Sequence, residues 1–190
     1  MPRARSGDTK ARIQAVALEL FASKGLQQTS LRDIADQLGM TKPALYYHFA
    51  SRDELVRSLA IPLIDDMTAF LAGLEASPAD PRELLGAYFD VTYRHRVLLQ
   101  VAIRDLSVLQ QMDLTDHVFD WRRRIVALLI GPSPSLEHQV RGMVALGGLS
   151  DCTVAFEDVD VDELRTAAVA AAYDALRPGV QGMSAQGMAP

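Results

Sequence analysis

The sequence predicts an all-α fold of about nine helices, with a small N-terminal unit of three helices and a larger helical C-terminal domain. Apolar residues recur at the i, i+3, i+4 spacing of amphipathic helices along most of the 190 residues. No segment sustains the period-2 alternation of a β-strand. The composition, 49% hydrophobic and 23% charged, is that of a globular chain.

The first two predicted helices are amphipathic, and the second is short. Residues 9–24 form the first, and Gly25 supplies its C-terminal cap. The second is predicted over residues 31–38, between the capping residue Ser30 and the helix-breaking Gly39. The apolar face of the first helix consists of Ile13, Val16, Ala17, Leu20 and Phe21.

The third and fourth helices follow without a long loop. Thr41 can cap the third, with Pro43 in the first turn, where a missing N–H breaks no helical hydrogen bond. A capping box opens a fourth helix over residues 51–74. Pro62 should bend or break that helix, because it cannot donate to the Ser58 carbonyl.

The C-terminal part contains further helices, separated by breaks rich in Pro and Gly. They are predicted over residues 82–107 as one or two helices, over 115–130, over 136–156 after the cap Ser135, and from Asp160 or Asp162 to about Leu176.

Charge is divided unevenly along the chain. The formal net charge is −5, which would disfavour nucleic acid as a partner if it were spread evenly. Residues 1–57, however, hold nine Lys and Arg against six Asp and Glu, a balance of +3, and residues 58–190 hold ten against 18, a balance of −8. The acidic total therefore does not exclude DNA as a partner of the N-terminal unit.

Cysteine content and hydropathy indicate the compartment. The single Cys152 cannot form an intrachain disulfide, and the N-terminus lacks the apolar centre of a signal peptide. The longest aliphatic run, residues 125–130, is far shorter than the roughly 18 residues of a membrane span. We therefore expect a reduced, cytoplasmic protein with no membrane contact.

The second and third helices are separated only by Gly39 and Met40, so they should cross steeply, as in a helix-turn-helix. Ala35 is small where the helices would meet, and Gly39 tolerates a positive φ. An ordinary helical hairpin is the alternative. A small core can be closed by Ile34, Leu38, Met40 and Leu45.

The segment TSLRDIADQLGMTKPALYYHFASRDELV, preceded by a helix ending in LFASKG, resembles the DNA-binding segment of tetracycline-repressor (TetR) family regulators. The resemblance covers about residues 9–57, and residues 45–55 are its most specific part. It departs from the family pattern at Arg52, where Lys is more frequent, so phosphate contact there should survive with altered geometry. The resemblance implies a homodimer that binds a palindromic operator in double-stranded DNA, and a C-terminal domain that binds a small-molecule effector.

The resemblance also implies two sets of DNA-contacting residues. Facing the major groove would be Thr41, Lys42, Pro43, Ala44 and Tyr46, and holding phosphates would be Ser30, Arg32, Tyr47, His48 and Arg52. Lys42 can donate to guanine, and Ala44 or Pro43 can touch a thymine methyl group, as this division requires. For His48 a buried, hydrogen-bonded position is the alternative, and one of the two tyrosines is expected to lie partly in the core.

Four segments are expected along the chain: a flexible basic arm over 1–8, a DNA-binding domain over 9–50, a ligand-binding and dimerisation domain over 51–178, and a flexible tail over 179–190. Arg3, Arg5 and Lys10 could add phosphate contacts from the arm, although a solvated arm is the simpler interpretation.

The resemblance implies pairing through the last two long helices, and their small residues would allow close approach. Core helices of a monomer are the alternative. The candidate interface residues are Gly142, Ala145, Gly148, Leu164, Ala168, Ala171, Ala172 and Ala175.

The middle helices could enclose an apolar pocket for a largely apolar effector. Its candidate lining is Tyr88, Phe89, Tyr93, Met112, Phe119, Trp121 and Phe156, although each could belong to the core. Residues 122–124, three consecutive arginines, are most simply a solvated face, although one could pair an anionic ligand. Acidic and histidine residues over 113–120 complete no metal-ligand set, so we expect neither metal nor cofactor.

The expected function is a ligand-responsive transcriptional repressor that its effector releases from DNA. A helical protein-interaction adaptor, or a small-molecule carrier with a purely structural helix-turn-helix, is the alternative. No phosphate-binding loop, nucleophile with its base, or carboxylate pair is recognisable, so an enzyme is not expected.

Overall fold

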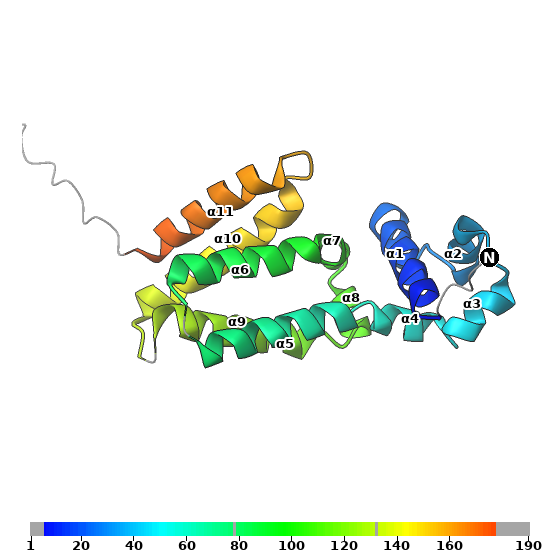
Figure 1. Ribbon diagram of the computed structural model, residues 1–190, viewed down its shortest axis with the longest axis horizontal. Coiled ribbons are helices and arrows are strands. Elements are labelled where there is room, and N and C mark those ends of the chain that lie inside the picture. The colour runs from blue at the N-terminus through cyan, green and yellow to red at the C-terminus, as the bar shows by residue number, and fades with distance from the viewer. Residues whose placement is uncertain (1–5, 78, 132, 178–190) are drawn as a thin grey trace, which may run out of the picture.

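The computed structural model describes residues 6–77, 79–131 and 133–177, and within these ranges it contains eleven α-helices and no strand (Figure 1). The predicted all-α class is confirmed. Helices α1 to α4 gather at one end of an elongated molecule, and α5 to α11 form the rest. The helices are α1 (Ser6–Lys24), α2 (Leu31–Leu38), α3 (Lys42–His48), α4 (Arg52–Ser58), α5 (Ile61–Ala76), α6 (Pro81–Arg94), α7 (Arg96–Arg104), α8 (Ser107–Gln111), α9 (Thr115–Ile130), α10 (Leu136–Ala155) and α11 (Val161–Leu176).

The first helix begins earlier than the sequence pattern predicts. Residues 6–8, which we assigned to the basic arm, are helical and form the first turn of α1. Asp8 lies in this turn, where a negative charge is favourable to the positive end of the helix dipole. The remainder of the predicted arm, residues 1–5, and the predicted tail over 179–190 lie outside the described residues.

The N-terminal unit is built around the predicted apolar face of α1. Ile13, Ala17 and Phe21 are buried, and Val16 lies at the edge of the same core. Leu45 of α3 and Leu55 of α4 are completely buried in the same cluster. Burial of each such side chain stabilises the folded state by about 1.5–3 kcal/mol, so the small unit depends on all four helices for its core.

Pro62 divides the predicted fourth helix into two. Helix α4 ends at Ser58, and α5 begins at Ile61 with the proline in its first turn. Because Pro62 has no N–H, the Ser58 carbonyl loses its helical donor. The side chain of Gln14 in α1 supplies a substitute: its Nε2 donates to the Ser58 carbonyl and to the Ser58 hydroxyl, both at 3.0 Å.

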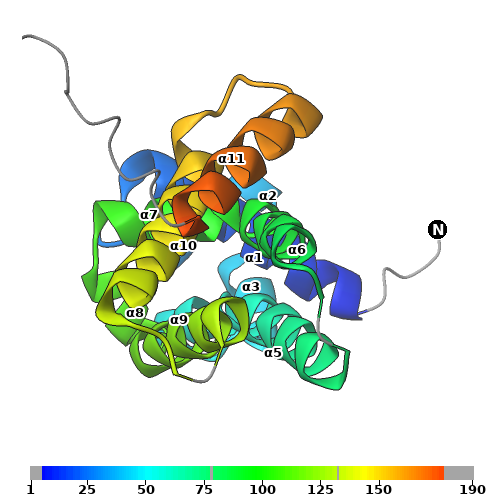
Figure 2. The ribbon, with the colours of Figure 1, turned by 90° about the vertical axis from the view of Figure 1, so that its left-hand side faces the viewer.

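The C-terminal part is a helical bundle in which α10 and α11 form a pair that packs against α6 (Figure 2). Arg165 of α11 holds this arrangement by a two-pronged ion pair with Asp90 of α6, at 2.7 and 3.0 Å. On the other side, α9 packs against both α10 and α5. No helix within the described ranges is both long and apolar enough to cross a membrane.

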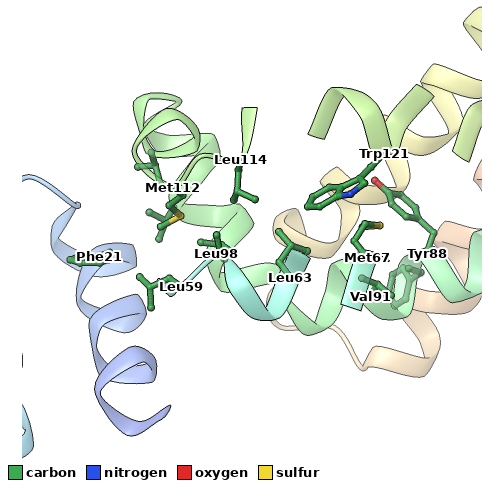
Figure 3. Packing of buried hydrophobic residues seen from close by; sticks show 14 of the residues in the cluster. Phe21, Leu59, Leu63, Met67, Tyr88, Val91, Leu98, Met112, Leu114 and Trp121 are labelled. Carbon is green, nitrogen blue, oxygen red and sulfur yellow. The ribbon is translucent and has the colours of Figure 1, made fainter. Parts of the chain in front are cut away.

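Two short helices connect the C-terminal part to the N-terminal unit. The segment over 82–107, predicted as one or two helices, is interrupted at His95 and again at Asp105. It therefore forms α6 and α7, and its last residue, Ser107, begins α8. Helix α7 packs against α1, and α8 packs against α4. Figure 3 shows the resulting continuous core: Phe21 and Leu59 face Leu98 of α7 and Met112 after α8. Helices α7 and α8 therefore share one hydrophobic core with α1 and α4.

Candidate DNA-binding surface and effector cavity

A tight turn after α2 sets the direction of α3. Gly39 has φ 63°, in the left-handed region that glycine adopts readily, and the Met40 N–H donates to the Ala35 carbonyl at 2.9 Å. Ala35 is buried where the two helices cross. Thr41 then caps α3, because its hydroxyl accepts from the Ala44 N–H at 3.4 Å. These contacts confirm the predicted helix-turn-helix.

A capping box fixes the start of α2. The Asp33 N–H donates to the Ser30 hydroxyl at 3.2 Å, and the Ser30 N–H donates to the Asp33 carboxylate at 2.8 Å. Hydrogen bonds from the Ser30 side chain and backbone lower the pKa of Asp33. Ser30 is thus exposed beside the N-terminus of α2 but already engaged in the cap.

Helix α3 presents most of its predicted groove-facing side chains to solvent. Its core-facing positions are taken by Leu45 and by Phe49 one turn later. Neither tyrosine therefore joins the core, contrary to our expectation: Tyr46 is 41% exposed and Tyr47 82% exposed. Also exposed are Thr41, Lys42 and Pro43, whereas Ala44 is half-buried.

Basic and aromatic groups are adjacent on this surface. The Lys42 Nζ lies 5.6 Å from the centre of the Tyr46 ring, within the range of a cation–π contact. Lys10 belongs to α1 rather than to a mobile arm, and its Nζ lies 5.2 Å from the centre of the Phe49 ring. His48 is half-buried rather than buried, and its ring stands edge-on to that of Tyr47 at 5.2 Å.

The candidate phosphate ligands differ in their accessibility. Arg32 is exposed and pairs with Asp36, which is also exposed, at 3.6 Å, a contact that solvent weakens. Arg52 points inward instead: its Nε donates to the Thr29 carbonyl at 3.3 Å, and its Nη2 donates to the Leu26 carbonyl. The planar guanidinium thus joins the loop before α2 to the start of α4, a positioning role that the sequence pattern did not reveal.

A largely apolar cavity, partly open to solvent, lies in the C-terminal part between α5, α6, α7, α8, α9 and α10, and it has a volume of about 210 Å³. Figure 3 shows four of its lining side chains, Leu63 and Met67 of α5, Tyr88 of α6 and Trp121 of α9. The polar residues of its lining are Tyr88, Thr92, Arg122, Ser150 and Asp151. An apolar enclosure with few polar groups is the usual form of a small-molecule site.

Only two of the seven expected lining residues, Tyr88 and Trp121, border this cavity. Phe89 is completely buried and stacks on Tyr93 at 5.6 Å, and Met112 belongs to the core beside α1. Phe119 and Phe156 are 71% and 49% exposed on the surface. An aromatic residue in an amphipathic helix signals an apolar environment, but it does not distinguish a core from a cavity wall. Sequence reasoning missed the cavity's aliphatic lining, such as Leu63 and Ile125, for the same reason.

The expected dimer residues divide between core and surface. Gly142 is buried against α9, where an added Cβ would lie 3.2 Å from the Val126 side chain. Also buried within the chain are Ala145, Leu164, Ala168 and Ala172. Gly148 and Ala171 are exposed and Ala175 is half-buried. The buried residues pack α10 and α11 against other helices of the same chain. For these residues the structure agrees with the alternative that they belong to the core of a monomer.

The outer face of α10 is nevertheless apolar. Its first three turns expose large hydrophobic side chains, which we call the α10 patch: Leu136, Val140, Met143 and Val144. Gly148 continues the patch along α10, and Ala171 is exposed on the neighbouring α11. A contiguous exposed patch of this kind is typical of a protein interface.

Comparison with known proteins agrees with these features. The family described as "Bacterial regulatory proteins, tetR family" matches residues 13–59. The HTH-type transcriptional repressor KstR2 of Mycobacterium tuberculosis H37Rv is 37% identical over 78 residues, which are 41% of this chain and 39% of the relative. The HTH-type transcriptional regulator EthR of Mycolicibacterium smegmatis is 32% identical over 84 residues, 44% of this chain and 39% of the relative. The chain thus matches less than half the length of either relative.

Solved structures extend the similarity to the C-terminal part. A transcriptional regulator from Aquifex aeolicus VF5 superposes with a TM-score of 0.70 at 26% identity, over 86% of this chain and 96% of that chain. A TetR-like transcriptional regulator from Rhodococcus sp. RHA1 has the same fold, with a TM-score of 0.66 at 23% identity over 93% and 98% of the two chains. The helix-turn-helix segment of this chain therefore matches the TetR family of bacterial regulatory proteins, and most of the chain has the fold of a known transcriptional regulator.

Proposed function

We propose that this chain is a ligand-responsive transcriptional repressor that binds a palindromic operator as a homodimer and is released by a small-molecule effector. The observation that carries this proposal is the exposed face of α3, a helix held rigidly by caps at the end of a helix-turn-helix. Its side chains are short, hydroxyl-bearing, basic or aromatic, as reading of the major groove requires.

The accessible side chains suggest a division of DNA contacts. Thr41, Lys42, Pro43, Ala44 and Tyr46 face the groove, and Ser30, Arg32, Tyr47 and His48 contact phosphates beside it. Lys10 in α1 adds a cation next to α3. We assign Arg52 to positioning, because its donors already bind two backbone carbonyls, and a phosphate would have to displace them.

The exposed apolar side chains of the α10 patch support dimerisation through this face. Two copies that pair through it and the adjoining face of α11 cover side chains that a monomer leaves exposed. Such a two-fold dimer places its two α3 helices on half-sites about 10 base pairs apart or a multiple of that spacing. Pairing also doubles the few specific contacts that one α3 can make.

The structure suggests a route from effector to DNA. The cavity is lined by Leu99, Ala102 and Ile103 of α7, and by Leu106 and Leu109 around α8. These helices touch α1 and α4, and the broken hinge at Pro62 separates α4 from α5. An effector that favours a different position of α7 and α8 lowers operator affinity by shifting the spacing of the two α3 helices.

The relatives named above support regulation rather than catalysis, since they are named as a transcriptional repressor and a transcriptional regulator. KstR2 is named a repressor, which favours repression as the sign of regulation here. A repressor of chromosomal genes acts in the cytoplasm, and this is the location that we propose.

Gel-shift titration against the DNA flanking the protein's own gene, at several salt concentrations, tests the proposal. We expect a sequence-specific complex whose affinity falls steeply with salt. Lys42→Ala should reduce discrimination between bases at one or two operator positions, and Arg32→Ala should weaken binding to all DNA sequences alike. Arg177→Ala, at the C-terminal end of α11, is the matched control and should change neither the base discrimination nor the overall affinity for DNA. A complex without sequence preference would favour the adaptor alternative.

The same assay tests the hinge. Pro62→Ala should alter operator affinity or its response to effector, because a continuous helix couples α4 to α5 more stiffly. If both quantities stay unchanged, the transmission route through α4 and α5 is wrong.

A further inference from the structure

The polar residues of the effector cavity come from three of the helices that line it. Residues that α5, α7 and α8 contribute are all apolar, among them Leu63, Leu99 and Leu109. The hydroxyl, guanidinium and carboxylate groups come from α6, α9 and α10. A ligand that fits this cavity therefore has an apolar body and one polar end.

The three arginines of α9 have different environments. Arg123 pairs with Asp120 at 2.6 Å, and Arg124 pairs with Glu75 at 2.5 Å. Arg122 is half-buried and borders the cavity, and among the described residues no carboxylate lies within ion-pair distance of it. Its Nη2 reaches toward α10, where an added Cβ on Gly147 would lie 3.7 Å away. A half-buried cation without a paired anion favours an anionic ligand.

Two hydroxyl-bearing residues, Tyr88 and Ser150, line the same cavity, and the Tyr88 hydroxyl lies close to Arg122. The Tyr88 side chain is buried, and this burial raises its pKa even though Arg122 and the Ser150 hydroxyl, close by, act in the opposite direction. Tyr88 is therefore neutral and keeps its proton available for donation. Arg122, Tyr88 and Ser150 together can offer several donors to one acceptor group.

One carboxylate opposes this arrangement. Asp151 also borders the cavity and is close enough to Tyr88 to raise the pKa of its hydroxyl. Asp151 is exposed, however, so water screens its charge, whereas Arg122 is partly removed from solvent. The less hydrated cation therefore decides the sign of the preferred head group.

We propose that the effector is an amphiphilic monocarboxylate whose carboxylate is bound by Arg122 and the Tyr88 hydroxyl, and whose apolar body lies against α5, α7 and α8. This inference rests on the proposed function, in which the cavity is the effector site. A cavity of about 210 Å³ exceeds the roughly 150 Å³ that holds a benzene molecule in an engineered cavity, so it suits a body of about six to ten carbon atoms.

Calorimetric titration with three probes of equal chain length tests the head group: octanoate, 1-octanol and octylamine. The wild-type protein should bind octanoate most tightly. Arg122→Gln should weaken octanoate binding by roughly 10- to 100-fold, the range of a lost charge-assisted hydrogen bond, and leave 1-octanol almost unaffected. Arg123→Gln is the matched control on the same helix and should leave all three affinities unchanged.

Arg122→Lys provides a second variant that keeps the charge, and it should retain part of the octanoate affinity even if Arg122→Gln folds poorly. The proposal is overturned if 1-octanol or octylamine binds the wild type as tightly as octanoate, if Arg122→Gln and Arg123→Gln bind octanoate equally, or if no probe binds. Gel shifts on the same preparation keep the outcomes distinct: a specific DNA complex together with failed octanoate binding refutes the head group and leaves the regulator proposal standing.

Discussion

The hydrogen bond between Gln14 and the Ser58 carbonyl should stabilise the protein only because Pro62 is present. Pro62 cannot donate to that carbonyl, and Gln14 does so from α1 at 3.0 Å, with a second contact to the Ser58 hydroxyl at the same distance. Gln14→Ala therefore leaves a half-buried carbonyl without a protein donor. We expect a loss of about 1 kcal/mol in the free energy of unfolding, at the lower end of the range for buried unsatisfied groups.

Pro62→Ala restores a backbone N–H at the position where a continuous helix would use it. Leu59 and Ala60, the capping residues on either side of the break, already have helical φ and ψ, so this N–H can reach the Ser58 carbonyl with little rearrangement. In the Pro62→Ala background, Gln14→Ala should then cost less than about 0.5 kcal/mol. The two substitutions should show a coupling energy of about 0.5–1 kcal/mol.

Urea unfolding followed by circular dichroism gives the four free energies of this cycle, at one fixed protein concentration because dimerisation contributes to stability. Gln110→Ala, an exposed helical position, is the control and should change stability by less than about 0.5 kcal/mol. Equal costs of Gln14→Ala with and without Pro62 would refute the reasoning, since the hydrogen bond would then be unrelated to the missing proline donor.

Other outcomes follow from single contacts. Thr41→Ala should destabilise the protein by about 1 kcal/mol through loss of the α3 cap, and Thr41→Ser should not; thermal unfolding distinguishes them. Hydrogen bonds from His95 and Arg94 lower the pKa of Asp66, so its carboxylate stabilises the fold above its unfolded pKa of about 3.9, and this contribution disappears as the pH falls through the lower folded value. Asp66→Asn should therefore destabilise at pH 6 and converge with the wild type below the folded pKa of Asp66 in urea unfolding at each pH; a constant difference would contradict this. Gly148→Ala meets open space and should raise helix stability by about 0.5–1 kcal/mol, whereas Gly142→Ala, 3.2 Å from Val126, should lose most of that gain. Gly148→Arg should shift the protein toward monomer in analytical ultracentrifugation if α10 forms the dimer interface; an unchanged dimer would place that interface elsewhere.

Local features of the chain were predictable because their causes are local. The caps at Ser30 and Thr41, the left-handed Gly39 and the break at Pro62 each depend on a few adjacent residues, and the structure has all four. Helix α9 occupies the predicted residues 115–130. The helix-turn-helix and its exposed α3 surface followed from the same short-range signals, as did the all-α class.

Periodicity indicates that a helix has an apolar face, but it does not say what covers that face. Gly142 and Ala168 turned out to pack within one chain, whereas Gly148 and Ala171 on the same two helices remain exposed. Phe89 is core and Phe119 is surface, although both looked suited to a pocket. Only the packing of α6, α9, α10 and α11 in the folded chain distinguishes core residues from surface residues.

The direction of a long side chain is another property that depends on distant segments. Arg52 looked like a phosphate ligand, yet the carbonyls of Leu26 and Thr29, more than 20 positions earlier, bind its guanidinium. In the run over residues 122–124, three identical residues differ because Asp120 and Glu75 pair with two of them and the third borders a cavity. The sequence by itself determined the helices, their caps and the DNA-binding motif, since these depend on neighbouring residues. The tertiary structure decided where the cavity lies, that Arg122 borders it, and which apolar side chains stay exposed. Each of these features depends on how segments far apart in the chain pack together.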